Sequence, residues 1–452
     1  MRDFRLPIRT FLAVLLLSTY GSVAQTIITQ FDGDIGTGGS ATTKPTYRDH
    51  PDATAAANGR QVVEVTGQNV NVYSYDGKLL KSTRTSDLIN AAGLKAEKVA
   101  DPRVIFDPFI GSGRWVLVCS CSDDFLIVSS GSDAVTSIWK GAAISQRSGD
   151  LTMKPGFDKN GLYITEFAQQ GLTYAGFAIP SADLAWSGSG NISLKNLSRF
   201  EGLGLDIMPA VDWNPSKQPS DPAYFVTRSG PMQNGANAPF AIVVHSLTWT
   251  GNTAKISEAK NVPTSFEYNT PVDETQPGPP NIRGMESHRT FSVQQVGNHL
   301  HVLEVCGPSA RSGEKHNLFF WLDISVPEMK MFQSAKVYSA SLGFLFPSLA
   351  VDQNQNVLMA ATGVSPAQPP SVYLFSHLAK EKRGTVKGPV MATPGTAAYV
   401  VCNIKSPVGW GTYTTVVSDA GDLNKFWVVS EYSNSGTPCQ WYTRLLQVSL
   451  AP

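Results

Sequence analysis

One pattern recurs along the chain and restricts its fold more than any other sequence feature. Each copy has a short apolar strand of alternating apolar and polar residues, a turn built from Asp, Asn, Gly or Pro, and a second apolar strand. The turn residues supply the backbone conformations that hairpins require. We find seven copies: Gln61 to Gly77, Asp101 to Ser120, Lys154 to Glu166, Asp206 to Arg228, His288 to Val305, Phe346 to Ala361 and Tyr413 to Glu431.

The number and spacing of these copies predict a propeller. Successive copies lie roughly 40 to 80 residues apart, which leaves room for two outer strands in each blade. A ring of four-stranded blades protects its strand edges by closing on itself. The 39 Gly and 29 Pro residues suit many strands joined by tight turns. We therefore predict an all-β fold, a β-propeller with seven blades, over residues 60–452. A pair of β-sandwich domains is the competing architecture, but it accommodates seven similar hairpins less well.

The beginning of the chain has the features of an export signal. Three arginines in the first nine residues precede the apolar run Phe11 to Leu17, and small residues follow at Ser22 to Ala24. We predict that residues 1–24 are a signal peptide, removed before Gln25, and that the protein is secreted. The apolar run is too short to span a bilayer, so no membrane insertion is expected. Residues 25–59 form an N-terminal segment in which we expect a closing strand.

Charge and motifs exclude several function classes. The 36 Lys and Arg residues balance 36 Asp and Glu residues, whereas nucleic-acid binding needs a basic surface. Neither a nucleophile elbow, nor a phosphate-binding loop, nor a His-Glu-x-x-His motif occurs. His299 and His301 share one face of a strand, and an ordinary polar face is favoured there over a metal site. We expect no cofactor or metal, no nucleic acid, a monomeric state, and an extracellular polysaccharide or glycoprotein as partner.

Several segments of the repeats resemble a known family. They are Asp101 to Val104, Gly113 to Trp115, Phe346 to Asp352 and Gly409 to Tyr413. They are similar to segments in secreted bacterial sialidase-like propeller proteins. The resemblance implies a propeller, without a general activity. Sialidase activity itself is not implied, because the nearest segment to a sialidase Asp box, Ser132 to Trp139, lacks the Gly and the spacing.

The candidate functional residues lie where the repeats begin. If the first strand of each copy is the innermost strand of its blade, the residues at its start converge around one mouth of the central channel. These residues are Asp101, Arg103, Lys154, Asp206, Glu286, His288, Arg289, Phe346 and Tyr413. Carboxylates, cations, an imidazole and aromatic rings together are typical of a carbohydrate site.

Two functions from different classes remain open. The first is a binding propeller that holds an extracellular ligand, for which carbohydrate is the favoured class. The second is a glycoside hydrolase or polysaccharide lyase acting on an acidic sugar, whose carboxylate an Arg side chain can grip. The catalytic candidates are then His288, Tyr413 and Glu286, and the substrate-binding candidates are Arg103, Lys154, Asp206 and Arg289. A structural role for the same side chains, bridging neighbouring blades, is the alternative to both. The sequence favours binding by a small margin.

Overall fold

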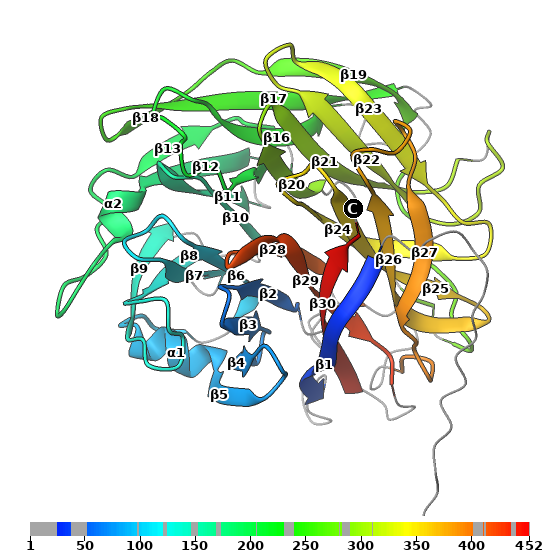
Figure 1. The fold of residues 1–452 in the computed structure, drawn as a ribbon, viewed down its shortest axis with the longest axis horizontal. Coiled ribbons are helices and arrows are strands. Elements are labelled where there is room, and N and C mark those ends of the chain that lie inside the picture. Colours follow the sequence, from blue (N-terminus) through cyan, green and yellow to red (C-terminus); the bar gives the residue numbers. More distant parts are fainter. Residues whose placement is uncertain are drawn as a thin grey trace, which may run out of the picture.

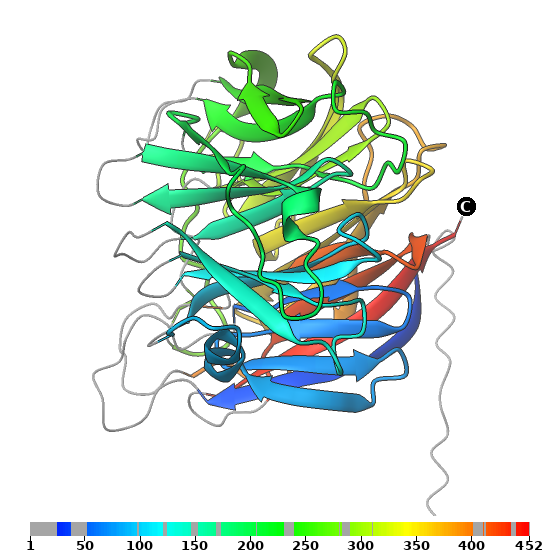
Figure 2. The ribbon, with the colours of Figure 1, turned by 90° about the vertical axis from the view of Figure 1, so that its left-hand side faces the viewer.

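The computed structural model describes residues 25–37, 52–96, 99–120, 124–145, 152–168, 173–204, 206–229, 239–279, 281–282, 290–309, 311–400, 410, 413–434 and 440–451. The described residues form seven small sheets arranged in a ring, which confirms the predicted all-β, seven-bladed propeller (Figure 1). The two short helices, α1 (Thr85–Ala91) and α2 (Ser181–Leu184), lie on the outside of the ring (Figure 2). Within this described part of the chain, no helix has the length and apolarity needed to cross a membrane.

The first three blades are regular, with four antiparallel strands each, in sequence order from the innermost strand outward. Blade 1 comprises β2 (Thr54–Ala57), β3 (Gln61–Val65), β4 (Asn69–Ser74) and β5 (Leu79–Arg84). Blade 2 comprises β6 (Ala100–Asp107), β7 (Arg114–Ser120), β8 (Asp124–Ser129) and β9 (Trp139–Ser145). Blade 3 comprises β10 (Met153–Phe157), β11 (Gly161–Ala168), β12 (Thr173–Pro180) and β13 (Ser198–Glu201).

Blades 4 and 5 share an interrupted inner strand. Blade 4 comprises β14 (Met208–Pro209), β16 (Ala223–Ser229), the long β17 (Pro239–Thr250), and two outer segments, β18 (Thr253–Ile256) and β19 (Lys260–Glu267), which both pair with β17. The chain then crosses at β15 (Val211–Asp212), which pairs in parallel with β20 of blade 5. Blade 5 continues through β20 (Thr290–Val296), β21 (His299–Cys306), β22 (Leu318–Ser325) and β23 (Lys330–Val337).

The last two blades close the ring. Blade 6 comprises β24 (Gly343–Val351), β25 (Val357–Ser365), β26 (Gln368–His377) and β27 (Lys387–Thr393). Blade 7 comprises β28 (Thr415–Asp419), β29 (Asp422–Tyr432), β30 (Gln440–Leu450) and, outermost, β1 (Gln25–Thr37). The N-terminal strand β1 runs antiparallel to β30, from Gln25 opposite Leu450 to Thr37 opposite Gln440. The two ends of the described chain therefore lie side by side in one blade (Figure 1).

The seven repeats found in the sequence correspond to the seven blades, but the first repeat begins one strand later in its blade than the others do. Six of the seven copies cover the innermost strand and the strand after it. The first copy, Gln61 to Gly77, instead covers β3 and β4, because the innermost strand of blade 1 is β2. Strand β2 is short and consists of Thr and Ala alone, so it lacks the large alternating apolar residues by which the other inner strands were recognised.

Six innermost strands end in the same side-chain turn. In each, an Asp or Asn side-chain oxygen accepts a hydrogen bond from the backbone N–H two residues later, at 2.8 to 3.1 Å. Such Asx turns satisfy the backbone where the strand stops and reverse the chain toward the second strand. The residues are Asn58, Asp107, Asp158, Asp212, Asp352 and Asp419.

Asp107 is a turn residue with a strongly raised pKa. Its Oδ1 accepts the bond from Phe109, but its Oδ2 is buried without a hydrogen-bond partner among the described residues. Burial, with the nearby Asp158 carboxyl adding to it, raises the pKa of Asp107 to about 8. The folded protein therefore keeps this proton to higher pH than the unfolded chain does, and the stabilisation present at low pH is lost as the pH rises toward 8.

We expect Asp107→Asn to flatten this pH dependence. Asparagine keeps the acceptor oxygen of the turn and cannot ionise, so the stability of the variant relative to the wild type should rise from pH 4 to pH 9. Urea denaturation at both pH values measures the difference. An equal stability difference between the two proteins at pH 4 and pH 9 would contradict the assignment.

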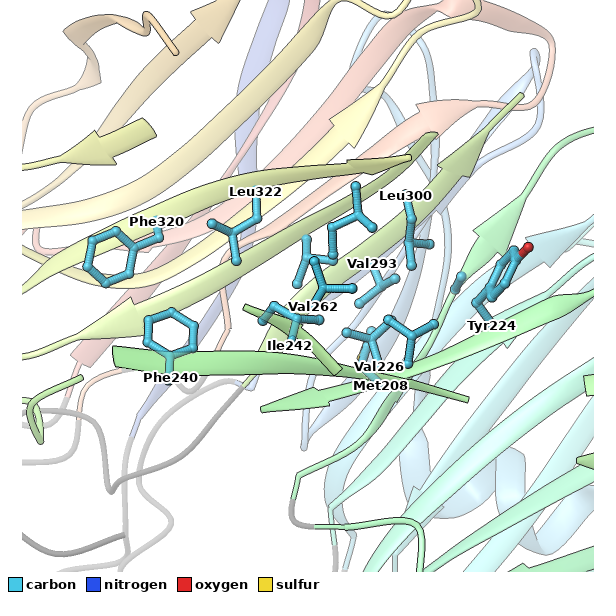
Figure 3. Close-up of a cluster of buried hydrophobic side chains, with 14 of the residues drawn as sticks. Met208, Tyr224, Val226, Phe240, Ile242, Val262, Val293, Leu300, Phe320 and Leu322 are labelled. Carbon is cyan, nitrogen blue, oxygen red and sulfur yellow. The ribbon is translucent and has the colours of Figure 1, made fainter. Parts of the chain in front are cut away.

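Hydrophobic clusters fill the spaces between neighbouring blades. In the described residues each of the seven interfaces has its own cluster of buried side chains. Between blades 4 and 5, Ile242 and Val262 face Leu300 and Leu322, with Phe240 near Phe320 (Figure 3). Because the last interface joins blade 7 to blade 1, the hydrophobic contacts close around the ring.

Candidate functional site

The chain turns sharply as it approaches four of the innermost strands. Asp52, Asp101, Asp206 and Phe346 all have φ between 46° and 58°, in the left-handed region that side chains other than Gly rarely adopt. The residues two positions later are Thr54, Arg103, Met208 and Ser348, and all four line the central channel. We call this end of the channel, where the innermost strands begin, the N-terminal mouth.

Three of the predicted site residues meet at this mouth. The Tyr413 hydroxyl, just before the first strand of blade 7, donates to Oδ1 of Asp101 in the first strand of blade 2 at 3.1 Å. The guanidinium of Arg103 lies over the Tyr413 ring, with its carbon 3.8 Å from the ring centroid. Thr152 of the third blade donates to the other oxygen of Asp101 at 3.2 Å. The ring of Tyr413 is therefore held between a carboxylate partner and a cation.

A second pair lies between blades 3 and 4. Lys154 Nζ contacts Asp206 Oδ1 at 2.5 Å and donates to the Asp206 backbone carbonyl at 3.2 Å. Both side chains are largely buried. Thr165 adds a hydrogen bond to the carbonyl of Ile207 at 2.8 Å. This pair joins adjacent blades, as the structural alternative for these residues predicts, and neither residue lines the channel cavity.

The remaining predicted residues are placed differently. Glu286, His288 and Arg289 lie outside the described residues, so their predicted roles stay predictions. Phe346 adopts the left-handed backbone described above, and its buried side chain joins a cluster with Trp410, Trp441 and Tyr399. Phe346 therefore shapes the approach to an inner strand and is not a cavity-lining ring.

A cavity of about 120 Å³ lies on the axis below the mouth. Residues from all seven blades line it, with apolar side chains in the majority. At the level where the innermost strands end, Phe157 and Trp213 pack edge to face, with ring centroids 4.8 Å apart. The mouth carries the charged groups and the interior carries the apolar ones.

A set of buried glutamates lies on the second strands of four blades and was not predicted from the sequence. They are Glu64, Glu166, Glu304 and Glu431, each at most 1% exposed. Glu166 lies 3.7 Å from Arg199, and Glu304 lies 3.9 Å from Arg228. A single Glu inside an otherwise apolar strand is the sequence signal that marks these positions, since such a residue is rarely buried without a partner.

Glu64 connects the closing strand to blade 1. Its Oε2 accepts from the Asp34 backbone N–H at 3.0 Å and from the Tyr73 hydroxyl at 3.1 Å, and Thr443 donates to Oε1. Burial raises the pKa of Glu64 to about 7, although the Thr443 hydroxyl opposes the shift. This carboxyl lies at the junction of β1, blade 1 and blade 7, so its contacts are those of a structural residue.

The comparisons with known proteins identify neither a family nor a function for this chain. No protein-family model matches the chain, and no curated protein matches it, so the resemblance to sialidase-like propellers stays a prediction. Among solved structures, the extracellular domains of Drosophila semaphorin 1a are 8% identical, with a TM-score of 0.46, covering 94% of this chain and 88% of that one. The Dos1 propeller is 9% identical, with a TM-score of 0.38, covering 87% and 76%. These similarities are distant, and the seven-bladed assignment rests on the sheets themselves.

Proposed function

We propose that the protein is a secreted binding propeller that holds an anionic extracellular ligand at the N-terminal mouth of its channel. The sequence favours carbohydrate as the ligand class, and because Arg103 is a cation we test acidic carbohydrate first. Secretion is supported by the leader-like residues 1–24. The observation that carries the proposal is Arg103, a cation at the rim of the axial cavity.

The local contacts of Arg103 support a binding role. Its Nε is buried and has no hydrogen-bond partner among the described residues, and no ion pair to its guanidinium is found there. Its stacking on Tyr413 fixes the guanidinium plane without using the N–H groups. A carboxylate or sulfate group is the natural partner for such donors, because charge-assisted hydrogen bonds to Arg are strong and directional.

The paired state of the other mouth residues favours binding over catalysis. The Tyr413 hydroxyl already donates to Asp101, and Lys154 is neutralised by Asp206. A general base or acid needs access to the substrate proton that it moves. The hydrolase or lyase predicted as the alternative would then depend on Glu286 and His288, which lie outside the described residues, so we rank it second.

A binding screen tests the proposal. The purified mature protein is incubated with polygalacturonate, alginate and neutral dextran, and retention, new reducing ends and the ultraviolet absorbance of unsaturated uronates are read together. We expect retention on an acidic polymer without product, and at least about tenfold weaker retention for Arg103→Gln, from the loss of charge-assisted hydrogen bonds.

The control removes an equivalent charge away from the mouth. Arg84→Gln changes an exposed arginine on the outer strand of blade 1 and should bind as the wild type does. Product that disappears in Tyr413→Phe would replace the binding proposal with the enzyme. Retention that is equal in the wild type and in Arg103→Gln would remove Arg103 from the site.

A further inference from the structure

The side chains that line the channel restrict the chemical class of ligand that can bind there. We infer that the ligand is an amphipathic carboxylate, whose apolar body, an aromatic ring or a short aliphatic chain, enters the axial cavity while its carboxylate binds Arg103. This inference rests on the proposed function, since both use Arg103 at the same mouth. It goes further by choosing an apolar acid over a sugar acid.

The polar side chains of the cavity wall already have partners in neighbouring blades. Thr54 of blade 1 accepts from Val104 N–H at 3.1 Å and donates to the carbonyl of Pro102 at 3.3 Å in blade 2. Ser292 of blade 5 is bonded to Ser348 of blade 6 at 3.0 Å. Blade 7 joins this chain because Ser348 accepts from its Val416 N–H at 3.0 Å.

The other polar groups of the wall also have partners. Gln294 forms a two-way amide pair with the backbone of Val351 in the next blade, at 2.8 and 2.9 Å. Thr415 and Ser418 of blade 7 donate to backbone carbonyls of blades 1 and 6 at 3.4 Å, while Thr414 is bonded to Ser430 of its own blade at 3.1 Å. Apart from Thr414, these hydroxyl and amide groups link neighbouring blades.

The rest of the wall is apolar and contributed by every blade. Its members include Ala56, Phe106, Phe157, Val211, Trp213 and Leu349. An apolar cavity of roughly 150 Å³ stays dry and binds benzene, because water there lacks hydrogen-bond partners. The cavity of about 120 Å³ is close to that size and suits one ring or a short chain.

Arg103 supplies the polar end of the site. Among the side-chain atoms of the cavity wall in the described residues, its Nε is the one that is buried and has no hydrogen-bond partner. A carboxylate placed there would satisfy this donor while the body of the same molecule extends toward Phe157 and Trp213. The cavity thus pairs one anion-binding group with an apolar space of defined size.

A sugar acid fits this arrangement less well. Each ring hydroxyl that entered the cavity would lose its hydrogen bonds to water and find wall hydroxyls and amides that are already bonded to other protein groups. Burying a polar group without a partner is unfavourable, and a pyranose carries several such groups. An aromatic or aliphatic acid avoids this cost and gains from burial of its apolar surface.

Titration calorimetry on the full mature protein tests the inference. Phenylacetate and hexanoate are compared with phenylacetamide, the neutral analogue of the former, and with glucuronate. We expect both apolar acids to bind at least tenfold more tightly than phenylacetamide or glucuronate. Arg103→Gln should remove the preference for phenylacetate over phenylacetamide.

A second variant tests the cavity itself. Val211→Phe places a ring in the space that the ligand body would occupy and should abolish phenylacetate binding, while Val272→Phe, the same change at a residue 40% exposed, should leave it unchanged. Thermal melts of both variants show whether each has folded. Loss of binding in a folded Val211→Phe protein supports the cavity as the site.

The outcomes separate this inference from the proposed function. If glucuronate or an acidic polymer binds through Arg103 while phenylacetate does not, the inference is wrong and the proposed function stands. If phenylacetamide binds as well as phenylacetate, the cavity takes apolar bodies without a role for the carboxylate, which also overturns the inference. Binding of none of these probes or polymers would overturn both.

Discussion

Removal of residues 25–37 is expected to lower the melting temperature by more than about 10 °C. Strand β1 is the outer strand of blade 7, and ten of its residues lie opposite residues of β30 in an antiparallel pair. Deleting β1 exposes the whole edge of β30, the strand nearest the end of the chain (Figure 1). Each lost backbone hydrogen bond contributes about 0.5 to 1.5 kcal/mol net, and the losses add along the strand.

The effect should exceed that of removing an edge strand alone, because β1 also joins blade 7 to blade 1. Phe31 packs against Tyr73 of blade 1 and Trp427 of blade 7, with ring centroids 5.2 and 6.0 Å away. Asp34 accepts from Thr66 at 2.7 Å and donates its backbone N–H to Glu64. Deletion therefore opens the one interface at which the chain must close on itself.

Differential scanning calorimetry of the protein with and without residues 25–37 measures the change. Ile28→Ser is the control, since this side chain is 46% exposed on the same strand and its loss leaves the pairing intact. It should melt within about 2 °C of the wild type. A shortened protein that melts as the wild type does would show that the ring closes without β1.

The second large effect is expected at Lys217. Its side chain, 2% exposed, lies between the turn carboxylates of two blades, with Nζ 2.7 Å from Asp212 and 3.2 Å from Asp158. It also donates to Gln295 of blade 5 at 3.0 Å. Replacing it with methionine leaves two buried carboxylates without their cation, so we expect Lys217→Met to cost about 3 to 5 kcal/mol of unfolding free energy.

Urea denaturation near neutral pH measures this cost against two references. Lys159→Met removes an exposed lysine beside Asp158 and should change stability by less than about 0.5 kcal/mol. Adding Asp212→Asn to Lys217→Met removes one of the stranded charges and should restore part of the loss. If the two lysine variants behave alike, Lys217 is not the cation that neutralises these turns.

Much of the architecture could be predicted because the signals are local. A strand's alternation and the Asp or Asn of its turn are set by neighbouring residues, so the hairpins were found from the sequence. The exception was blade 1, whose innermost strand of Thr and Ala carries no apolar alternation. Asp residues adopt a positive φ more readily than most residues, so the sharp turns at Asp52, Asp101 and Asp206 are consistent with their residue type. The positive φ of Phe346 could not be expected from its residue type.

The site could be predicted in outline only. Because Asp101, Arg103 and Tyr413 lie at the starts of repeats, the sequence predicted that they gather at one mouth of the channel. In the structure, Tyr413 contacts both Asp101 and Arg103. No local sequence pattern predicts that Lys154 pairs with Asp206, because the two residues meet only when the blades pack. The same holds for Lys217, which is buried although its neighbours in the loop are exposed.

The sequence by itself determined the all-β class, the seven repeated hairpins and the turn chemistry that ends six of the inner strands, because each of these features depends on residues a few positions apart. Only the tertiary structure decided that β1 pairs with β30 and that Lys217 lies between the turn carboxylates of Asp158 and Asp212. It also decided which polar side chains of the channel form hydrogen bonds with other blades. Those outcomes depend on side chains that lie far apart in the chain, such as Asp101 and Tyr413, which meet only when the ring closes. The hydrogen bonds between and within blades engage the other polar groups of the channel wall. They leave the apolar cavity and the buried Nε of Arg103 available for a ligand.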